Sequence, residues 1–218
     1  MTSADESNQD APPNQDAPLD WARSREMNGV EALMWRAESD PRMRSTICSL
    51  ALLDRMPDWD RFVDACEWGS RMAPRFRQKV VEPAFGLGIP VWVNDPGFDL
   101  HYHVRRVRLS EQGGFRECFE IAEQIAMTPF DRARSPWEAV LIEGLPDGQA
   151  ALLVKLHHST TDGMGGFQLF SQLHSRTREH NPDKPQPKAL PPEWISPTDL
   201  LFEQMTREAR SAPDTLRK

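Results

Sequence analysis

The sequence lacks several features that would assign it to a special class. No apolar run approaches the roughly 20 residues that a membrane-spanning helix needs. The start of the chain has no basic segment followed by an apolar stretch, so we expect no secretory signal. The three cysteines, Cys48, Cys66 and Cys118, are too scattered for a metal pattern or a disulfide framework. A net charge of −7 argues against a general nucleic-acid binder. These absences favour a cytoplasmic protein.

The residues that are present describe one globular unit with tails. The chain has 218 residues, of which 39% are hydrophobic and 27% are charged, and this suits one full domain. Residues 1–20 are polar and acidic and repeat Asn-Gln-Asp-Ala-Pro, which predicts a disordered tail. Residues 21–180 carry the apolar patterns of a folded domain. Residues 181–218 begin with a Pro- and Lys-rich segment that predicts an extended linker, and they continue into an amphipathic helix over residues 198–210.

The patterns inside the domain predict an α/β fold. Helices are expected over residues 27–35, 58–71 and 115–127, the first capped by Asn28 and the last with Phe115 and Phe119 facing inward. Strands are expected over residues 44–53, 76–81, 91–93, 101–109, 137–145 and 149–156. We expect a mixed, largely antiparallel sheet with helices on one face. His101 and His103 would share a face of their strand, either as a metal pair or, with no third ligand evident, as ordinary surface or core residues.

The strand over residues 149–156 leads into the most informative stretch of the chain. His157 and His158 follow it, and after them come Asp162, Gly163 and two further glycines. Histidine exchanges protons near neutral pH. Adjacent residues of an extended segment point to opposite faces, so only one histidine can face a substrate, and we expect the other to be buried and structural. Asp162 could hold the loop through an ion pair or by accepting backbone N–H bonds, and the glycines permit a tight turn.

This stretch resembles the HHxxxDG signature of the CoA-dependent acyltransferase superfamily, which includes chloramphenicol acetyltransferase and peptide-synthetase condensation domains. Residues 27–54 also resemble the opening of the bacterial wax ester synthase/diacylglycerol acyltransferase family, and residues 135–138 read Ser-Pro-Trp-Glu where that family has Pro-Leu-Trp-Glu. The resemblance implies that His158 is the general base, that His157 supports it, that Asp162 is structural and that Gly163 forms the turn. It implies a chloramphenicol-acetyltransferase-like half, with residues 21–180 as the N-terminal acyltransferase domain, residues 181–218 as an interdomain segment and the C-terminal domain absent.

The resemblance also implies a reaction. A fatty acyl group would pass from acyl-CoA to diacylglycerol or to a long-chain alcohol, without a cofactor or a metal. The expected partners are acyl-CoA, a lipid hydroxyl acceptor and, as one option, a separately encoded C-terminal half, with no nucleic acid among them. We expect a peripheral location at a membrane or lipid droplet. Two alternatives stay open: an inactive truncated half-domain or lipid-associated binding protein, and a condensation-type acyltransferase that uses another acceptor.

Overall fold

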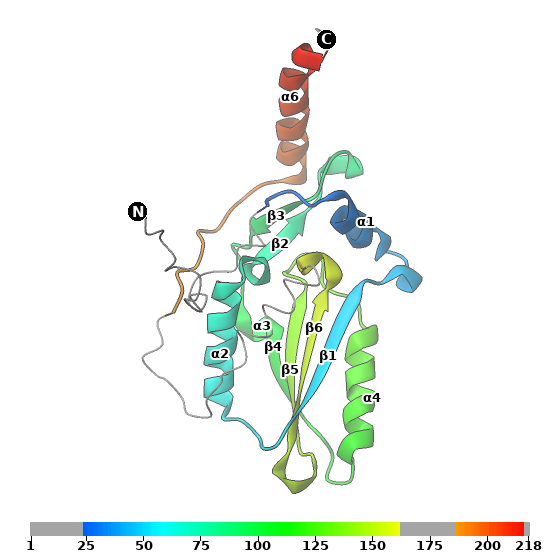
Figure 1. Cartoon of the computed structure of the whole chain (residues 1–218), viewed down its shortest axis with the longest axis vertical. Helices are drawn as coiled ribbons and strands as arrows, with labels where there is room; N and C mark the ends of the chain where they lie inside the picture. Colours follow the sequence, from blue (N-terminus) through cyan, green and yellow to red (C-terminus); the bar gives the residue numbers. More distant parts are fainter. Residues whose placement is uncertain (1–23, 162–185, 216–218) are drawn as a thin grey trace, which may run out of the picture.

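The structure is a computed structural model that describes residues 24–161 and 186–215. Its helices and strands are interspersed along the chain (Figure 1). The helices are α1 (Gly29–Ala37), α2 (Trp59–Met72), α3 (Leu100–His103), α4 (Gly114–Met127) and α6 (Pro197–Thr215). The strands are β1 (Thr46–Leu53), β2 (Gln78–Val81), β3 (Val91–Asn94), β4 (Val104–Arg108), β5 (Trp137–Glu143) and β6 (Ala150–His157). The predicted tail over residues 1–20 lies outside the described residues.

Four of the strands form the main sheet, in the order β1-β6-β5-β4. Strand β1 runs antiparallel to β6 along its whole length, from Thr46 opposite His157 to Leu53 opposite Ala150. Strand β5 is also antiparallel to β6, whereas β4 is parallel to β5. The sheet is therefore mixed and largely antiparallel, as predicted. The strand that leads to the two histidines is an inner strand, paired on both sides.

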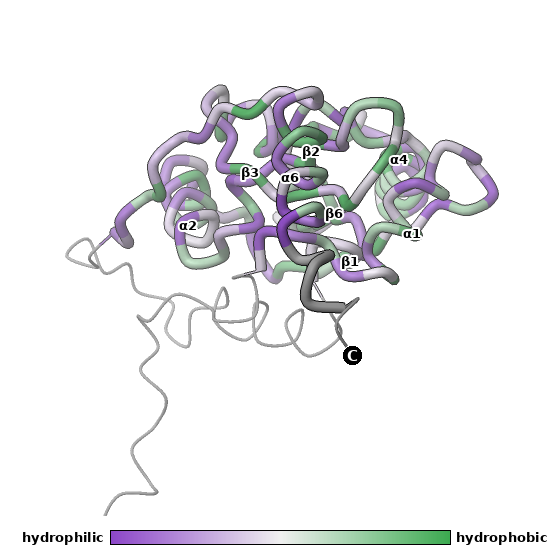
Figure 2. The backbone as a smooth tube through the Cα atoms, turned by 90° about the horizontal axis from the view of Figure 1, so that it is seen from above, coloured by the Kyte–Doolittle hydropathy of each residue, from purple (hydrophilic) through white to green (hydrophobic). Residues whose placement is uncertain are grey.

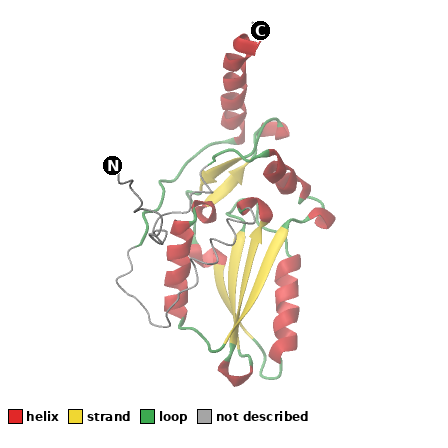
Figure 3. Ribbon diagram, in the orientation of Figure 1, coloured by secondary structure: helices red, strands yellow, loops and turns green. Residues whose placement is uncertain are grey.

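Helices cover both faces of this sheet (Figure 3). Successive side chains of a strand point to opposite faces, and in β5 and β6 both sets are largely apolar. One core cluster joins α2 to Trp137, Ala139 and Leu156, and the other joins α4 to Val140, Ile142 and Leu153. The expectation of helices on one face is wrong, because these inner strands have no polar face to leave in water.

Helix α1 begins at a capping box. The Asn28 side chain accepts the backbone N–H groups of Val30 and Glu31, both at 2.9 Å, and the Glu31 carboxylate accepts the N–H of Asn28 at 3.0 Å. The predicted cap is thus confirmed. Trp35, in the last part of the helix, is buried against the small antiparallel sheet of β2 and β3, where it meets Val80 and Trp92. The chain leaves α1 at Glu38, its C-cap residue.

The histidines before β4 lie on a helical turn and not on a strand. The Asp99 side chain accepts the N–H of His101 at 3.0 Å and so caps α3, and β4 starts only at Val104. His101 is exposed while His103 is completely buried. The two do not share a face, and the metal-pair alternative is wrong. No group of three or more His, Cys, Asp or Glu residues in the described part of the chain is placed to hold a metal ion.

Helix α4 is where the sequence predicts it, but its inward face differs. Cys118, Ile121 and Ile125 face the sheet, whereas Phe115 and Phe119 are exposed. Two apolar stripes one residue apart run along this helix. The sequence pattern alone therefore does not determine which stripe packs against the sheet.

The last helix, α6, extends away from the rest of the molecule (Figure 1). Leu200 is buried against Val91 and Val93 of β3. The Gln204 amide accepts the N–H of Ile89 at 3.0 Å and donates to its carbonyl at 2.7 Å. These contacts confirm the helix predicted near residues 198–210, and residues 186–196 before it contain neither helix nor strand. Among the described helices, none is long and apolar enough to cross a membrane.

Candidate active site

The two histidines at the end of β6 occupy different environments. His157 is the last residue of β6 and is completely buried, whereas His158 opens a short 3-10 turn, His158–Thr160, and is exposed. The backbone N–H of His157 donates to the carbonyl of Pro136 at 3.0 Å, and that of His158 donates to the carbonyl of Ser45 at 2.7 Å. The strand pairing therefore continues through both residues and turns their side chains to opposite sides. The predicted division into one buried and one accessible histidine is confirmed.

The ring of buried His157 is held through both nitrogens. Nδ1 accepts the backbone N–H of Ser159 at 3.0 Å and lies 2.7 Å from the Ser159 hydroxyl. Since a backbone N–H can only donate, Nδ1 is an acceptor, and the ring proton belongs on Nε2 when the imidazole is neutral. Nε2 touches the carboxylate of Glu38. His157 thus joins the end of α1 to the turn that carries His158.

Aromatic rings close the remaining sides of His157. The Trp35 ring meets the imidazole edge-on with centroids 5.3 Å apart, and Phe130 does so at 6.2 Å. Arg132 lies over the outer face of Trp35 at 4.3 Å and donates to the Trp35 carbonyl at 3.0 Å. This enclosure keeps water from competing for the ring nitrogens, which strengthens their polar contacts.

A second buried polar group lies on the same face of the sheet. Lys155 is two residues before His157, and its side chain is completely buried. Its ammonium donates to the carbonyl of Thr128 at 2.6 Å, lies 3.6 Å from the Glu138 carboxylate and stands over the Phe130 ring at 4.2 Å. Burial lowers the pKa of Lys155, and the negative charge of Glu138 opposes that shift. Lys155 and Glu138 face each other across the β5–β6 pair, so they form a structural ion pair under the site.

The Ser-Pro-Trp-Glu segment at the start of β5 supports the other face of the sheet. The Ser135 hydroxyl donates to the Arg75 carbonyl at 2.9 Å, and the indole N–H of Trp137 donates to the Phe76 carbonyl at 2.8 Å. The Trp137 ring stacks on Phe76 with centroids 4.9 Å apart and on buried His103 with centroids 4.8 Å apart. Because Pro136 of this segment accepts the His157 N–H, the stack fixes the backbone beside the histidine pair.

The structure places some of the predicted site residues and not others. His157 and His158 lie at the end of β6, while Asp162 and Gly163 are outside the described residues. Two residues near the pair were not singled out from the sequence: Glu38, which touches His157, and Lys155, which lies two residues before His157 on the same face of the sheet. Lys155 had a signal, since it is a charge inside an otherwise apolar strand. The sequence signal for Glu38 is weaker: it lies three residues after Trp35, on the same side of a helix.

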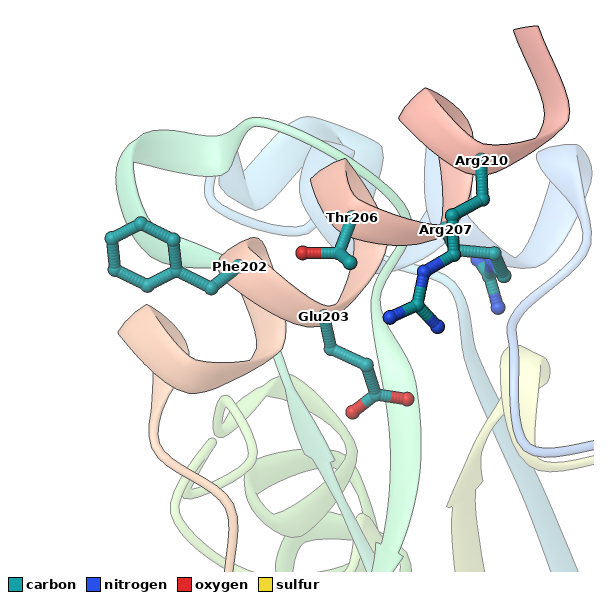
Figure 4. Close-up of a pocket in the computed structure, with 5 residues that line it drawn as sticks. All are labelled: Phe202, Glu203, Thr206, Arg207 and Arg210. Atoms are coloured by element: carbon teal, nitrogen blue, oxygen red, sulfur yellow. The ribbon is translucent and has the colours of Figure 1, made fainter. Parts of the chain in front are cut away.

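A surface hollow of about 410 Å³ lies elsewhere, on α6. It is lined by Phe202, Glu203, Thr206, Arg207 and Arg210 (Figure 4). Glu203 and Arg207 of this hollow pair with the segment before α1, namely with Arg25 at 3.1 Å and with Glu26. The hollow contains neither histidine of the pair, and its Glu203 and Arg207 side chains already have partners, so we assign it to the attachment of α6 and not to catalysis.

Comparison with known proteins gives the family. Residues 27–218 match the model of the wax ester synthase/diacylglycerol acyltransferase catalytic domain. The chain belongs to this family. Among other members, a putative diacylglycerol O-acyltransferase of Mycobacterium tuberculosis is 46% identical over 178 residues, which make up 82% of this chain and 36% of that protein. A probable diacylglycerol O-acyltransferase of the same species, tgs3, is 33% identical over 155 residues, 69% of this chain and 55% of that protein.

Solved structures agree with the family. A wax ester synthase/diacylglycerol acyltransferase from Marinobacter aquaeolei VT8 is similar with a TM-score of 0.61 and 25% identity, over 88% of this chain and 46% of that one. The first condensation domain of a calcium-dependent antibiotic synthetase shares the fold with a TM-score of 0.56 and 16% identity, over 70% of this chain and 38% of that one. The predicted fold class is confirmed. The chain spans about a third, 36%, of the length of the putative diacylglycerol O-acyltransferase of Mycobacterium tuberculosis that is 46% identical to it.

Proposed function

We propose that this family member takes part in the transfer of a fatty acyl group from acyl-CoA to the hydroxyl of diacylglycerol or of a long-chain alcohol. The observation that carries the proposal is the unequal histidine pair at the end of β6. His157 is buried and fully engaged, while His158 is exposed beside it. This leaves one imidazole accessible to a substrate at a position fixed by the sheet.

In the proposed reaction His158 acts as a general base. It removes the acceptor's hydroxyl proton while the oxygen attacks the thioester carbonyl, and the resulting imidazolium returns that proton to the departing CoA thiolate. Because His158 both removes and returns the proton, neither a covalent acyl-enzyme nor a metal is needed. A positioned base contributes about 10²–10⁴-fold to such a step, and orientation of the two substrates contributes further. Asp162 and Gly163 keep their predicted roles, in organising and turning the loop after the pair.

The partners follow from the substrates. Diacylglycerol and long-chain alcohols reside in membranes and lipid droplets, so we include a peripheral association with such a surface. Helix α6 exposes apolar side chains, which supports a further polypeptide surface as a partner, such as a separately encoded C-terminal half. The condensation-type reaction is less favoured, because the condensation domains share only the fold, at 16% identity in the example above.

A variant at His158 tests the proposal. Acyl transfer from palmitoyl-CoA to diacylglycerol and to hexadecanol is measured by product formation, with the chain alone and with a C-terminal half from a related family member. We expect His158→Ala to lower turnover by about 10²-fold or more, in line with the loss of a general base.

His101→Ala is the matched control. His101 is also an exposed histidine, but it lies on α3 and is not a member of the histidine pair. Its replacement should leave turnover unchanged. Near-normal turnover of the His158→Ala protein would remove His158 from the reaction, and transfer to neither acceptor would reject the proposed substrates.

A further inference from the structure

Glu38 lies where α1 and β6 meet. It is the C-cap residue of α1, and its carboxylate touches Nε2 of His157. The Glu38 side chain is only 9% exposed, and the His157 ring is completely buried. Among the described residues, neither the carboxylate oxygens nor Nε2 has a hydrogen-bond partner, and their polar contact is the one between Glu38 and Nε2. The two groups therefore depend on this one contact.

The surroundings of Nδ1, the other ring nitrogen of His157, explain why the contact between Glu38 and Nε2 matters. Nδ1 of His157 faces two donors, the backbone N–H of Ser159 and the Ser159 hydroxyl. A proton on Nδ1 would oppose the backbone N–H and open the 3-10 turn His158–Thr160. The turn is thus compatible with the tautomer that carries its proton on Nε2, and inside a dry aromatic enclosure that proton needs an acceptor.

We propose that Glu38 is a positioning residue of the histidine pair. Its carboxylate accepts the Nε2 proton of His157, keeps Nδ1 free to accept the Ser159 N–H, and in this way fixes the turn that holds His158. The reasoning parallels metal and catalytic sites in which a carboxylate sets the tautomer of a histidine through its second nitrogen. The role given to His158 rests on the proposed function, whereas the control of the His157 tautomer does not.

Glu38 has a positive charge in its surroundings. The Lys155 ammonium interacts electrostatically with Glu38 from the same face of the sheet. Trp35, one turn earlier in α1, packs its ring against the same imidazole, and so the helix presents both an aromatic side chain and an acceptor to His157. The capping box at Asn28 and Glu31 fixes the opposite end of this helix.

Ring-nitrogen NMR on the isotope-labelled 218-residue chain tests the tautomer directly. The chain has six histidines, so single substitutions assign their signals. We expect the neutral imidazole of wild-type His157 to show a protonated Nε2 and an unprotonated Nδ1. Glu38→Gln keeps an acceptor oxygen and should retain this pattern. Glu38→Leu keeps the volume without an acceptor and should shift the proton toward Nδ1 or average the two tautomers.

Glu31→Ala is the control for damage to α1 alone. It removes one bond of the capping box at the far end of the helix, so it should lower stability without changing the His157 spectrum. If wild-type His157 carries its proton on Nδ1, or if Glu38→Leu leaves the spectrum unchanged, Glu38 does not set the tautomer and the proposal is wrong. The wild-type spectrum decides even if Glu38→Leu does not fold.

Turnover adds a second measurement where acyl transfer is observed. Loss of the fixed turn should lower kcat about tenfold or more in Glu38→Leu, with little change in KM. The Glu38→Gln variant should keep most of the wild-type kcat. Equal kcat in the two variants would contradict the positioning role. A wild-type chain without acyl transfer counts against the proposed function only, because the ring spectrum still tests Glu38.

Discussion

Buried His103 is the residue whose environment has the clearest consequence for stability. Its ring lies between Trp137 and Phe98, with centroid distances of 4.8 and 5.2 Å, and Nδ1 lies 2.9 Å from the Trp137 carbonyl. A carbonyl only accepts, so Nδ1 carries a proton, and Nε2 has no partner among the described residues. Burial lowers the pKa of His103 below its ordinary value of 6.5; the hydrogen bond to Trp137 opposes this and Arg134 adds to it.

This lowered pKa predicts a pH-dependent stability. The unfolded chain binds a proton at His103 before the folded chain does, so the contribution is complete above about pH 6.5 and is lost as the pH falls toward the folded-state pKa. His103→Phe keeps a stacked ring but cannot titrate. We expect wild type to be more stable than this variant by about 1 kcal/mol at pH 7.5. The difference should shrink as the pH is lowered to about 5.5.

Chemical denaturation at several pH values measures this difference. Exposed His101 again supplies a control, because His101→Ala should follow the wild-type profile. A stability difference between wild type and His103→Phe that stays constant with pH would show that His103 has the same protonation in both states.

Of the site, the sequence predicts the residues that are adjacent in the chain. The inequality of His157 and His158 follows from strand geometry, which is local. The roles of Glu38 and Lys155 depend on which distant segments meet, since Glu38 comes from α1 and Thr128 from the end of α4. Nothing in one strand or helix alone specifies such a meeting.

Helix α6 has one buried and one exposed side. Leu200 and Gln204 are buried, while Phe202 and Met205 are 63% and 56% exposed, and the helix carries both hydrophilic and hydrophobic residues (Figure 2). Exposed apolar side chains that cluster on one element favour association. We expect the chain by itself to self-associate and to bind a hydrophobic dye, and Phe202→Gln combined with Met205→Gln to reduce both, as measured by analytical ultracentrifugation and dye fluorescence.

A substitution on the buried side of α6 should affect stability, in contrast to the substitutions on its exposed side. Leu200→Ala removes a contact with Val91 and Val93 and should lower the free energy of unfolding by about 2–4 kcal/mol. The Gln double variant should keep wild-type stability. Unchanged association in the double variant would show that another surface is responsible.

Among the elements, those with local signals are predicted well. The β5–turn–β6 hairpin follows from two apolar runs around Pro146-Asp147-Gly148, where Asp147 and Gly148 adopt the positive φ values that such residues tolerate. The start of β4 is predicted too early because Asp99 caps a helical turn that alternation hides. The inward face of α4 is not specified by its own sequence, since only contact with the sheet selects between its two apolar stripes.

At the scale of the whole molecule, we expect peripheral attachment to membranes. The described helices do not span a bilayer, and the net charge of −7 is repelled by anionic headgroups. Attachment should therefore be weak, and carbonate should release the protein from a membrane fraction, as followed by sedimentation and immunoblotting. A helix-spanning protein in the same fraction is the control that stays in the pellet. Retention of this chain until detergent is added would contradict the prediction.

The fold class could be predicted from alternating strand and helix patterns, but the order of the strands could not. The sheet places β1 next to β6, although all the other strands lie between them in sequence. Such pairing depends on long-range contacts that no local pattern encodes.

The central place of β6 also has a consequence for how the protein is made. Strand β6 is the last of the six to leave the ribosome, yet it separates β1 from β5 and is hydrogen-bonded to both. A nascent chain that ends before Ala150 has β1 without a partner and cannot complete the sheet. Translation must therefore pass the histidine pair before the domain closes, so a chain interrupted upstream is exposed to proteolysis. The proposed catalytic residue, His158, directly follows the strand on which closure of the sheet depends.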